Sequence, residues 1–310
     1  MIKSMFSRIK NKNVQTLLAI GVASILIRLL IQYDFDRSAL LYVGIPFLIA
    51  IFLLTIDRPK HSDNWKRSYL NLVILSLAIM LGSSIVLFEG FICVVMFMPI
   101  YFGVILLVFL FEALGEYLKR RRNGKNYVHV LPLFIAFGAF EGVLPEFSFE
   151  RDYQVTSEKI ILGSVDDIKN QLIQPINLNN SRHWMLELFP MPYEVQAESL
   201  SPGDIHTISF RYHRWFVTNT HEGSMKLEIS EVKDNYIRTT FVDDTSYISN
   251  YLELQGTEIY LTPIGDKQTK VTLTINYHRF LDPVWYFGPL QEYTVKRTAQ
   301  FLLDDMITPK

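Results

Sequence analysis

The chain has 310 residues, of which 49% are hydrophobic, 14% aromatic and 20% charged, and its formal net charge is −1. This composition excludes an intrinsically disordered chain, and the single cysteine, Cys93, excludes an internal disulfide framework. The net charge conceals two unlike parts. Residues 1–130 hold 15 Lys and Arg against 7 Asp and Glu, whereas residues 131–310 hold 15 against 24. The sequence therefore predicts a basic, apolar amino-terminal part and an acidic carboxy-terminal part.

The amino-terminal part contains long apolar runs. A bilayer core needs roughly 20 apolar residues per helix, and the runs approach that length at residues 14–31, 39–56, 70–88 and 91–111. A further run, residues 127–144, is apolar but contains Pro132 and is followed by Pro145. We therefore expect residues 1–147 to form an all-α transmembrane bundle, with residues 148–310 as a second domain.

Basic residues predict the orientation of this bundle. Lys and Arg cluster in the first 12 residues, in residues 58–67 and in residues 119–125. Short loops rich in Lys and Arg stay in the cytoplasm, so we expect an integral protein of a bacterial inner membrane with a cytoplasmic amino terminus. If residues 127–144 cross, there are five spans and the second domain is extracytoplasmic. If residues 127–144 do not cross, there are four spans and the second domain is cytoplasmic. The basic cluster before this run favours five.

From about Phe149 the pattern changes to alternation of apolar and polar residues, which is typical of half-exposed antiparallel strands. A first strand is predicted over residues 153–162, followed by a helix with Ser164 as its N-cap and Asp166 and Asp167 in its first turn. A short second helix is expected near residues 182–188. Further strands are expected at residues 194–200, 205–216, 225–232, 236–243, 251–262 and 270–280, and a long helix after Pro283.

This order of elements is that of the helix-grip fold, an α+β fold in which a curved antiparallel sheet surrounds a long carboxy-terminal helix. Residues 148–310 also resemble the START-like superfamily known as SRPBCC, whose members include polyketide cyclase/dehydrase-like proteins. The resemblance rests on "SEKIILGSVDDIKNQL", "GDIHTISFRYHRWF" and "TKVTLTINYHRFLDPVWY" in this domain and on "FEGFICVVMFMP" before it. The similar proteins notably include bacterial members that carry the domain after a multi-span membrane region.

The resemblance implies a cavity between the sheet and the last helix that holds a hydrophobic small molecule or a lipid. The last strand agrees, because Leu273, Ile275 and Tyr277 share one parity and therefore one face. A single aromatic residue is expected to fill the core, whereas some of the aromatic residues together are expected to build a pocket. The candidates for lining the cavity are Trp184, Phe210, Trp215, Phe241, Tyr251, Leu273, Ile275, Tyr277 and Trp285.

Catalytic residues are not identified by any motif. Four histidines of the second part, at positions 206, 213, 221 and 278, do not have metal-ligand spacing, and no phosphate-binding or nucleophile motif is present. We therefore expect no metal and no cofactor. The acidic balance of this part disfavours nucleic acid as a partner.

Three functions are compatible with these features. The leading hypothesis is a membrane-anchored protein that binds a lipid or hydrophobic small molecule without turnover. One alternative is a cyclase or hydratase that uses Tyr277, His278 or Arg279 on a hydrophobic substrate in the same cavity. The other is a membrane-tethered module that binds a protein partner, which the sequence does not identify.

Overall fold

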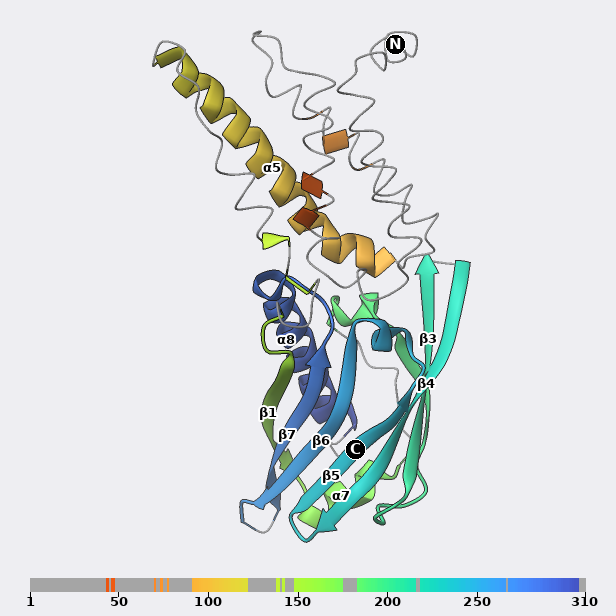
Figure 1. Cartoon of the computed structure of the whole chain (residues 1–310). Coiled ribbons are helices and arrows are strands. Elements are labelled where there is room, and N and C mark those ends of the chain that lie inside the picture. Colours follow the sequence, from red (N-terminus) through yellow and green to blue (C-terminus); the bar gives the residue numbers. More distant parts are fainter. Residues whose placement is uncertain are drawn as a thin grey trace. The chain divides into compact units, whose positions relative to one another are not determined.

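The structure is a computed structural model that describes isolated positions before residue 91, then residues 91–121, 138–139, 141–142, 148–174, 183–215, 218–265 and 267–306. The chain divides into two compact units, Met1–Phe149 and Glu150–Lys310 (Figure 1). The predicted apolar runs at 14–31, 39–56, 70–88 and 127–144 fall almost wholly outside the described residues.

The first unit contains the helix α5, Phe91–Arg121, which has 31 residues and includes Pro99. One face of α5 is buried and apolar, and it contains Ile100, Tyr101, Val104, Ile105 and Val108. Its exposed face is apolar as well, with Leu106, Leu107, Leu110, Phe111, Leu114 and Tyr117. Among the helical residues whose side chains the structure describes, there is no helix long and apolar enough to cross a membrane. The predicted spans and their orientation therefore stay predictions.

The second unit is built on one antiparallel sheet of seven strands. In sheet order they are β1, β7, β6, β5, β4, β3 and β2. Their bounds are Asp152–Leu162 (β1), Met191–Gln196 (β2), Ile205–Trp215 (β3), Thr218–Lys233 (β4), Tyr236–Asp244 (β5), Leu252–Pro263 (β6) and Gln268–Arg279 (β7). Figure 1 shows the sheet curling, with α8 next to its β1 and β7 side. Strands β1 and β2 are its two edges.

The helices of this unit follow the predicted order. The helix α7, Val165–Leu172, begins at a capping box in which the Ser164 hydroxyl accepts from the Asp167 backbone N–H and the Asp167 carboxylate accepts from the Ser164 N–H. A 3₁₀ turn, η4, covers Leu186–Leu188. The long helix α8, Val284–Phe301, runs into a π-helical turn, η6, at Leu302–Met306.

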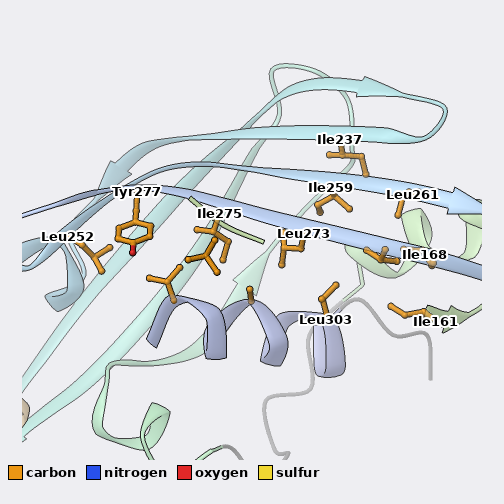
Figure 2. Packing of buried hydrophobic residues seen from close by; sticks show 14 residues of the cluster. Ile161, Ile168, Ile237, Leu252, Ile259, Leu261, Leu273, Ile275, Tyr277 and Leu303 are labelled. Atoms are coloured by element: carbon orange, nitrogen blue, oxygen red, sulfur yellow. The ribbon is translucent and has the colours of Figure 1, made fainter. Parts of the chain in front are cut away.

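The core lies between α8 and the face of the sheet that it covers. Along β7, every second residue from Thr269 to Arg279 is buried, as the alternation predicts. Figure 2 shows Leu273, Ile275 and Tyr277 projecting from β7 towards the helix, which carries Leu303 at its end. A curled antiparallel sheet packed on a carboxy-terminal helix fits the helix-grip fold, so the predicted fold of this domain is confirmed.

Three boundaries differ from the prediction. Strand β2 begins and ends earlier than residues 194–200, β4 begins at Thr218 rather than at Met225, and the predicted second helix is only the turn η4. The added part of β4 contains Gly223 and polar residues that local preferences place in a turn. Its pairing with β3, from Trp215↔Thr218 to Phe210↔Gly223, overrides those preferences.

Candidate functional site

A cavity of about 290 Å³ lies between the covered face of the sheet and the carboxy-terminal helix. Six strands contribute to its wall, and the helices and the segment around η4 close the remaining sides. The strands supply Pro192, Val195, His206, Ile208, Phe210, Met225, Leu227, Ile229, Ile237, Thr239, Phe241, Leu252, Leu254, Thr257, Ile259, Leu273 and Ile275. The other elements supply Leu172, Leu186, Phe189, Pro190, Leu200, Ile248, Thr294, Val295, Thr298, Phe301 and Leu302.

Strand alternation explains why these residues share one face. On β3, for example, His206, Ile208 and Phe210 have the same parity and all line the cavity. Strand β6 changes parity between Leu254 and Thr257, because the register of its pairing with β7 shifts between Leu254 and Gly256. A single irregularity in β6 therefore keeps both halves of the strand facing the cavity.

Gly256 permits a close approach at this irregularity. A Cβ atom at position 256 would lie 2.5 Å from the backbone carbonyl oxygen of Thr239 on the neighbouring strand. Carbon and oxygen atoms that are not bonded do not approach so closely, so glycine is required for this backbone spacing. Thr239 lines the cavity, and Gly256 thus sets the position of part of its wall.

The hydroxyl groups in the wall are already hydrogen-bonded within the protein. Thr239 Oγ1 and Thr257 Oγ1 are 2.7 Å apart and buried. On α8, Thr294 donates to the Leu290 carbonyl oxygen at 2.8 Å, and Thr298 donates to the Thr294 carbonyl oxygen at 3.1 Å. The wall is therefore apolar in its chemistry even where threonine contributes to it.

His206 is the one titratable side chain among the described residues of the wall. Its Nε2 atom lies 2.6 Å from the carbonyl oxygen of Ser199. The other three histidines considered as metal ligands in the sequence lie outside the wall. His213 contacts the Thr220 hydroxyl, His221 contacts the Thr245 carbonyl oxygen, and His278 contacts the Asp152 carboxylate. In the part of the chain that the structure describes, no three His, Cys, Asp or Glu residues lie close enough to hold a metal ion.

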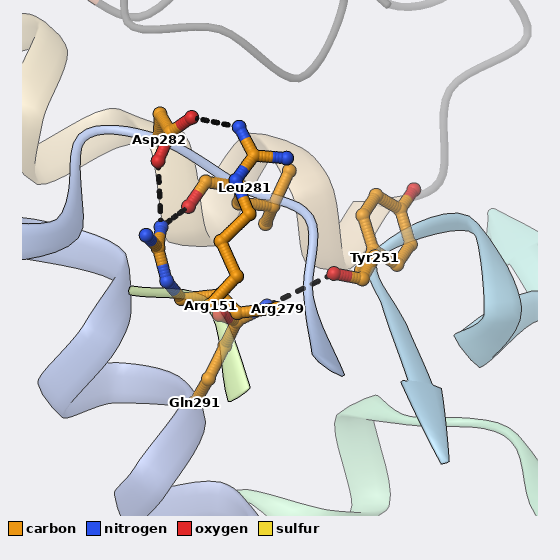
Figure 3. A network of polar contacts seen from close by, with 6 residues as sticks. All are labelled: Arg151, Tyr251, Arg279, Leu281, Asp282 and Gln291. Atoms are coloured by element: carbon orange, nitrogen blue, oxygen red, sulfur yellow. Dashed lines mark hydrogen bonds and ion pairs between the residues drawn. The ribbon is translucent and has the colours of Figure 1, made fainter. Parts of the chain in front are cut away.

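A buried ion-pair cluster lies where β7 leads into α8 (Figure 3). Arg279 and Asp282 are both fully buried. Arg279 Nη1 donates to Asp282 Oδ1 at 2.8 Å and to the Leu281 carbonyl oxygen, and Arg151 Nη2 donates to Asp282 Oδ2 at 2.5 Å. On α8, Gln291 Nε2 donates to the Tyr251 carbonyl oxygen at 3.1 Å. The cluster ties the start of β1 and the end of β7 to the start of α8.

Tyr277 precedes this cluster on the same face of β7. Its side chain is fully buried, and its ring stacks on Tyr153 with centroids 5.9 Å apart. Burial raises the pKa of the Tyr277 hydroxyl above its usual value, and the negative charge of Glu292 adds to this shift. The hydroxyl therefore stays protonated and can act as a hydrogen-bond donor.

The nine residues predicted to line a cavity do not all meet there. Phe210, Phe241, Leu273 and Ile275 line it, whereas Tyr251 and Tyr277 do not belong to its wall. Trp184 and Trp285 are 67% and 61% exposed, because one lies beside η4 and the other lies on the outer side of α8. The side chain of Trp215 is outside the described residues.

Most of the wall consists of aliphatic residues that the sequence did not single out, such as Ile208, Leu227 and Ile237. Their signal was present as parity within each strand, but the same parity is typical of an ordinary core. The face of α8 is a second case. Its buried positions are Phe287, Gly288, Gln291, Thr294, Val295 and Ala299, which are mostly small or polar.

No protein-family model matches the chain, and no curated protein matches it. Among solved structures, it is similar to a point mutant of norcoclaurine synthase from Thalictrum flavum, with 16% identity and a TM-score of 0.28 over 49% of this chain and 95% of that chain. It is similar to an aromatase/cyclase from Streptomyces sp. R1128, with 12% identity and a TM-score of 0.32 over 49% and 90%. A Staphylococcus aureus protein of unknown function gives 16% identity and a TM-score of 0.31 over 49% and 88%.

Proposed function

We propose that this chain is a membrane-anchored binding protein whose helix-grip unit holds a lipid or another hydrophobic small molecule without converting it. The observation that carries this proposal is the cavity itself, which is about 290 Å³ in volume and has an aliphatic and aromatic wall. The hydroxyl groups of Thr239, Thr257, Thr294 and Thr298 are engaged within the protein. Such a wall binds by shape and apolar contact.

The volume of the cavity supports an organic ligand. A cavity needs roughly 10–15 Å³ to hold one water molecule, and an apolar cavity of about 150 Å³ can stay dry and bind a molecule the size of benzene. At about 290 Å³ the present cavity is far larger than a packing defect and is close to the lower limit of known ligand pockets, whose range is roughly 300–1,000 Å³.

Anchoring in a bacterial inner membrane is supported by the apolar runs and by the basic loops between them. A cavity held at the bilayer surface shortens the path of a ligand that dissolves poorly in water. We keep the cytoplasmic amino terminus and five spans as the proposed topology.

The enzymatic alternative requires groups that the described wall does not supply. General acid–base catalysis needs positioned titratable groups within hydrogen-bond reach of the substrate, and His206 is alone among the described lining residues. The three groups considered for catalysis, Tyr277, His278 and Arg279, do not belong to the wall. We therefore do not propose turnover as the function of this cavity.

The proposal is tested by identifying molecules that co-purify with the full chain. The chain is extracted in a mild non-ionic detergent and its bound lipids are analysed by mass spectrometry. An Ile208→Trp variant fills the cavity from β3, and an Ile205→Trp variant is the matched control, because Ile205 lies on the same strand but is 54% exposed. We expect a bound species in the natural chain and the control, and its loss in Ile208→Trp.

Two outcomes would overturn the proposal. One is a lipid profile that does not exceed that of an unrelated membrane protein purified in the same way. The other is an unchanged profile in the Ile208→Trp variant. The topology has a separate test, in which a reporter that is active only outside the cytoplasm is fused after Lys310. Activity agrees with five spans, and silence of a stably produced fusion agrees with four.

A further inference from the structure

Three buried polar side chains near one end of the cavity each contain at least one atom that lacks a hydrogen-bond partner among the described residues. The Tyr277 hydroxyl, the Nε and Nη2 atoms of Arg279 and the Oε1 atom of Gln291 are buried without a partner among the residues that the structure describes. Tyr277 and Arg279 are 0% exposed and Gln291 is 3% exposed. Buried polar groups are nearly always paired, so three unpaired ones in one region call for an explanation.

Strand register places two of these groups beside the cavity. In the pairing of β6 with β7, Leu252 lies opposite Arg279 and Leu254 lies opposite Tyr277. Residues directly opposite in an antiparallel pair share one face and are immediate neighbours. Leu252 and Leu254 both line the cavity. Tyr277 and Arg279 therefore continue the face of β7 that supplies Leu273 and Ile275 to the wall, directly beside Leu254 and Leu252.

The helix brings the third group to the same end. Gln291 lies three and four residues before Thr294 and Val295, which line the cavity, so the three share one face of α8. Its Nε2 atom is held by the Tyr251 carbonyl oxygen, the residue before Leu252. Figure 2 shows the Tyr277 hydroxyl directed from β7 towards α8, and Figure 3 shows Arg279 and Gln291 in one region. The three polar side chains thus gather where the apolar wall ends.

The unpaired atoms of Arg279 have a defined arrangement. Its Nη1 atom is used by Asp282 and the Leu281 carbonyl oxygen, which leaves Nε and Nη2. These two atoms form one edge of the guanidinium plane, and that edge can donate two parallel hydrogen bonds to a carboxylate or phosphate. The Tyr277 hydroxyl is a further donor. The available groups are therefore mainly hydrogen-bond donors, which suits an oxyanion.

We infer that the cavity binds an amphipathic molecule whose alkyl chain lies against the apolar wall and whose acidic head group is held by Arg279 and Tyr277. This inference rests on the proposed binding function and specifies the class of ligand. A carboxylate and a phosphate offer the same oxyanion chemistry to the Arg279 edge. Gln291 can accept a hydrogen bond from a hydroxyl group next to the head group.

The test compares ligands that share one alkyl chain. Dodecanoate, dodecyl phosphate and 1-dodecanol, each radiolabelled, are titrated into the full chain in zwitterionic nanodiscs, with protein-free nanodiscs as background. A charge-assisted hydrogen bond contributes enough to make at least one of the two anions bind about tenfold more tightly than the alcohol. The anion whose affinity exceeds that of 1-dodecanol by the larger factor shows whether the site prefers a carboxylate or a phosphate head group.

Two variants test whether the tighter binding of the anion depends on Tyr277 and Arg279. Tyr277→Phe removes only the hydroxyl, and Arg279→Lys keeps the charge but removes the guanidinium edge. We expect both to weaken anion binding several-fold and to leave 1-dodecanol unchanged. Tyr260→Phe and Arg238→Lys are the matched controls, because both side chains are exposed. If Arg279→Lys does not fold, Tyr277→Phe decides the assignment, since the hydroxyl it removes makes no hydrogen bond with a described residue.

The outcomes separate this inference from the proposed function. Equal affinity for the anions and the alcohol in the natural chain overturns the inference but leaves hydrophobic binding in place. An anion preference that neither variant changes also overturns it. If no ligand binds above the nanodisc background, the proposed function fails and the inference fails with it.

Discussion

The buried threonine pair of the cavity wall gives a quantitative test of its apolar character. Thr239 and Thr257 are 7% and 9% exposed, and their hydroxyl oxygens lie 2.7 Å apart. Thr239→Val or Thr257→Val alone leaves the other hydroxyl buried without its partner, which lowers the free energy of unfolding by about 1–3 kcal/mol. Replacing both removes the pair together, so the double variant is expected to lose less than either single variant.

A second threonine pair in the same sheet serves as the control. Thr156 on β1 and Thr274 on β7 have hydroxyl oxygens 2.9 Å apart, but this pair is exposed to solvent. Water can replace the lost partner there, so the corresponding valine variants are expected to change the free energy of unfolding by no more than about 0.5 kcal/mol. The comparison isolates the effect of burial, because the chemistry of the two pairs is the same.

The assay is urea denaturation of the full chain, followed by intrinsic fluorescence, for each single and double variant. The coupling energy of a double-mutant cycle is the quantity compared. Additive losses at Thr239 and Thr257, or a coupling no larger than that of the exposed pair, would refute the reasoning. Water would then reach the two hydroxyls, and the wall at this point would not be dry.

Three further predictions concern stability. Gly256→Ala is expected to lower the free energy of unfolding by about 1–3 kcal/mol, measured by denaturation, because its Cβ would meet the Thr239 carbonyl oxygen; an unchanged stability would contradict the close approach. Ser164→Ala removes the N-cap of α7 and should cost about 1 kcal/mol, whereas Ser164→Thr should recover most of it. Hydrogen bonds from Ser164 lower the pKa of Asp167, so the folded value lies below the unfolded one. Its stabilising contribution is therefore full above about pH 4 and is lost as the pH falls through the folded value; acid titration of the natural chain should show this loss, and Ser164→Ala should show less of it.

The fold of the second unit could be predicted because its local signals agree with one another. Alternation located the strands, and Ser164 with Asp167 located the start of α7. The part of β4 from Thr218 to Gly223 could not be predicted, because Asn219 and Gly223 favour turns and pairing with β3 makes the segment a strand. The local sequence does not contain the contribution of this pairing between strands.

The cavity could be predicted only in outline. Its general place between sheet and helix followed from the resemblance, and Leu273 and Ile275 followed from parity. The choice of aromatic residues was less informative, since Trp184 and Trp285 are exposed. The residue types on the buried face of α8 explain why aromatic character was a poor guide to the wall. That face contains Gly288, Gln291 and Thr294 and only one aromatic residue, Phe287, whereas Trp285 lies on the exposed face.

The manner in which β1 joins the sheet has a mechanical consequence. Strand β1 is an edge strand, and the preceding chain reaches the sheet through it. A pull along the chain is therefore transmitted to β7 through eleven register pairs, from Asp152↔His278 to Leu162↔Gln268. When the force runs along the strand, the backbone hydrogen bonds between β1 and β7 are loaded together in shear and share the force. The ion pair between Arg151 and Asp282 lies just ahead of the first pair, so it would take up load before the strand does. A domain attached in this way resists being unravelled from its tether.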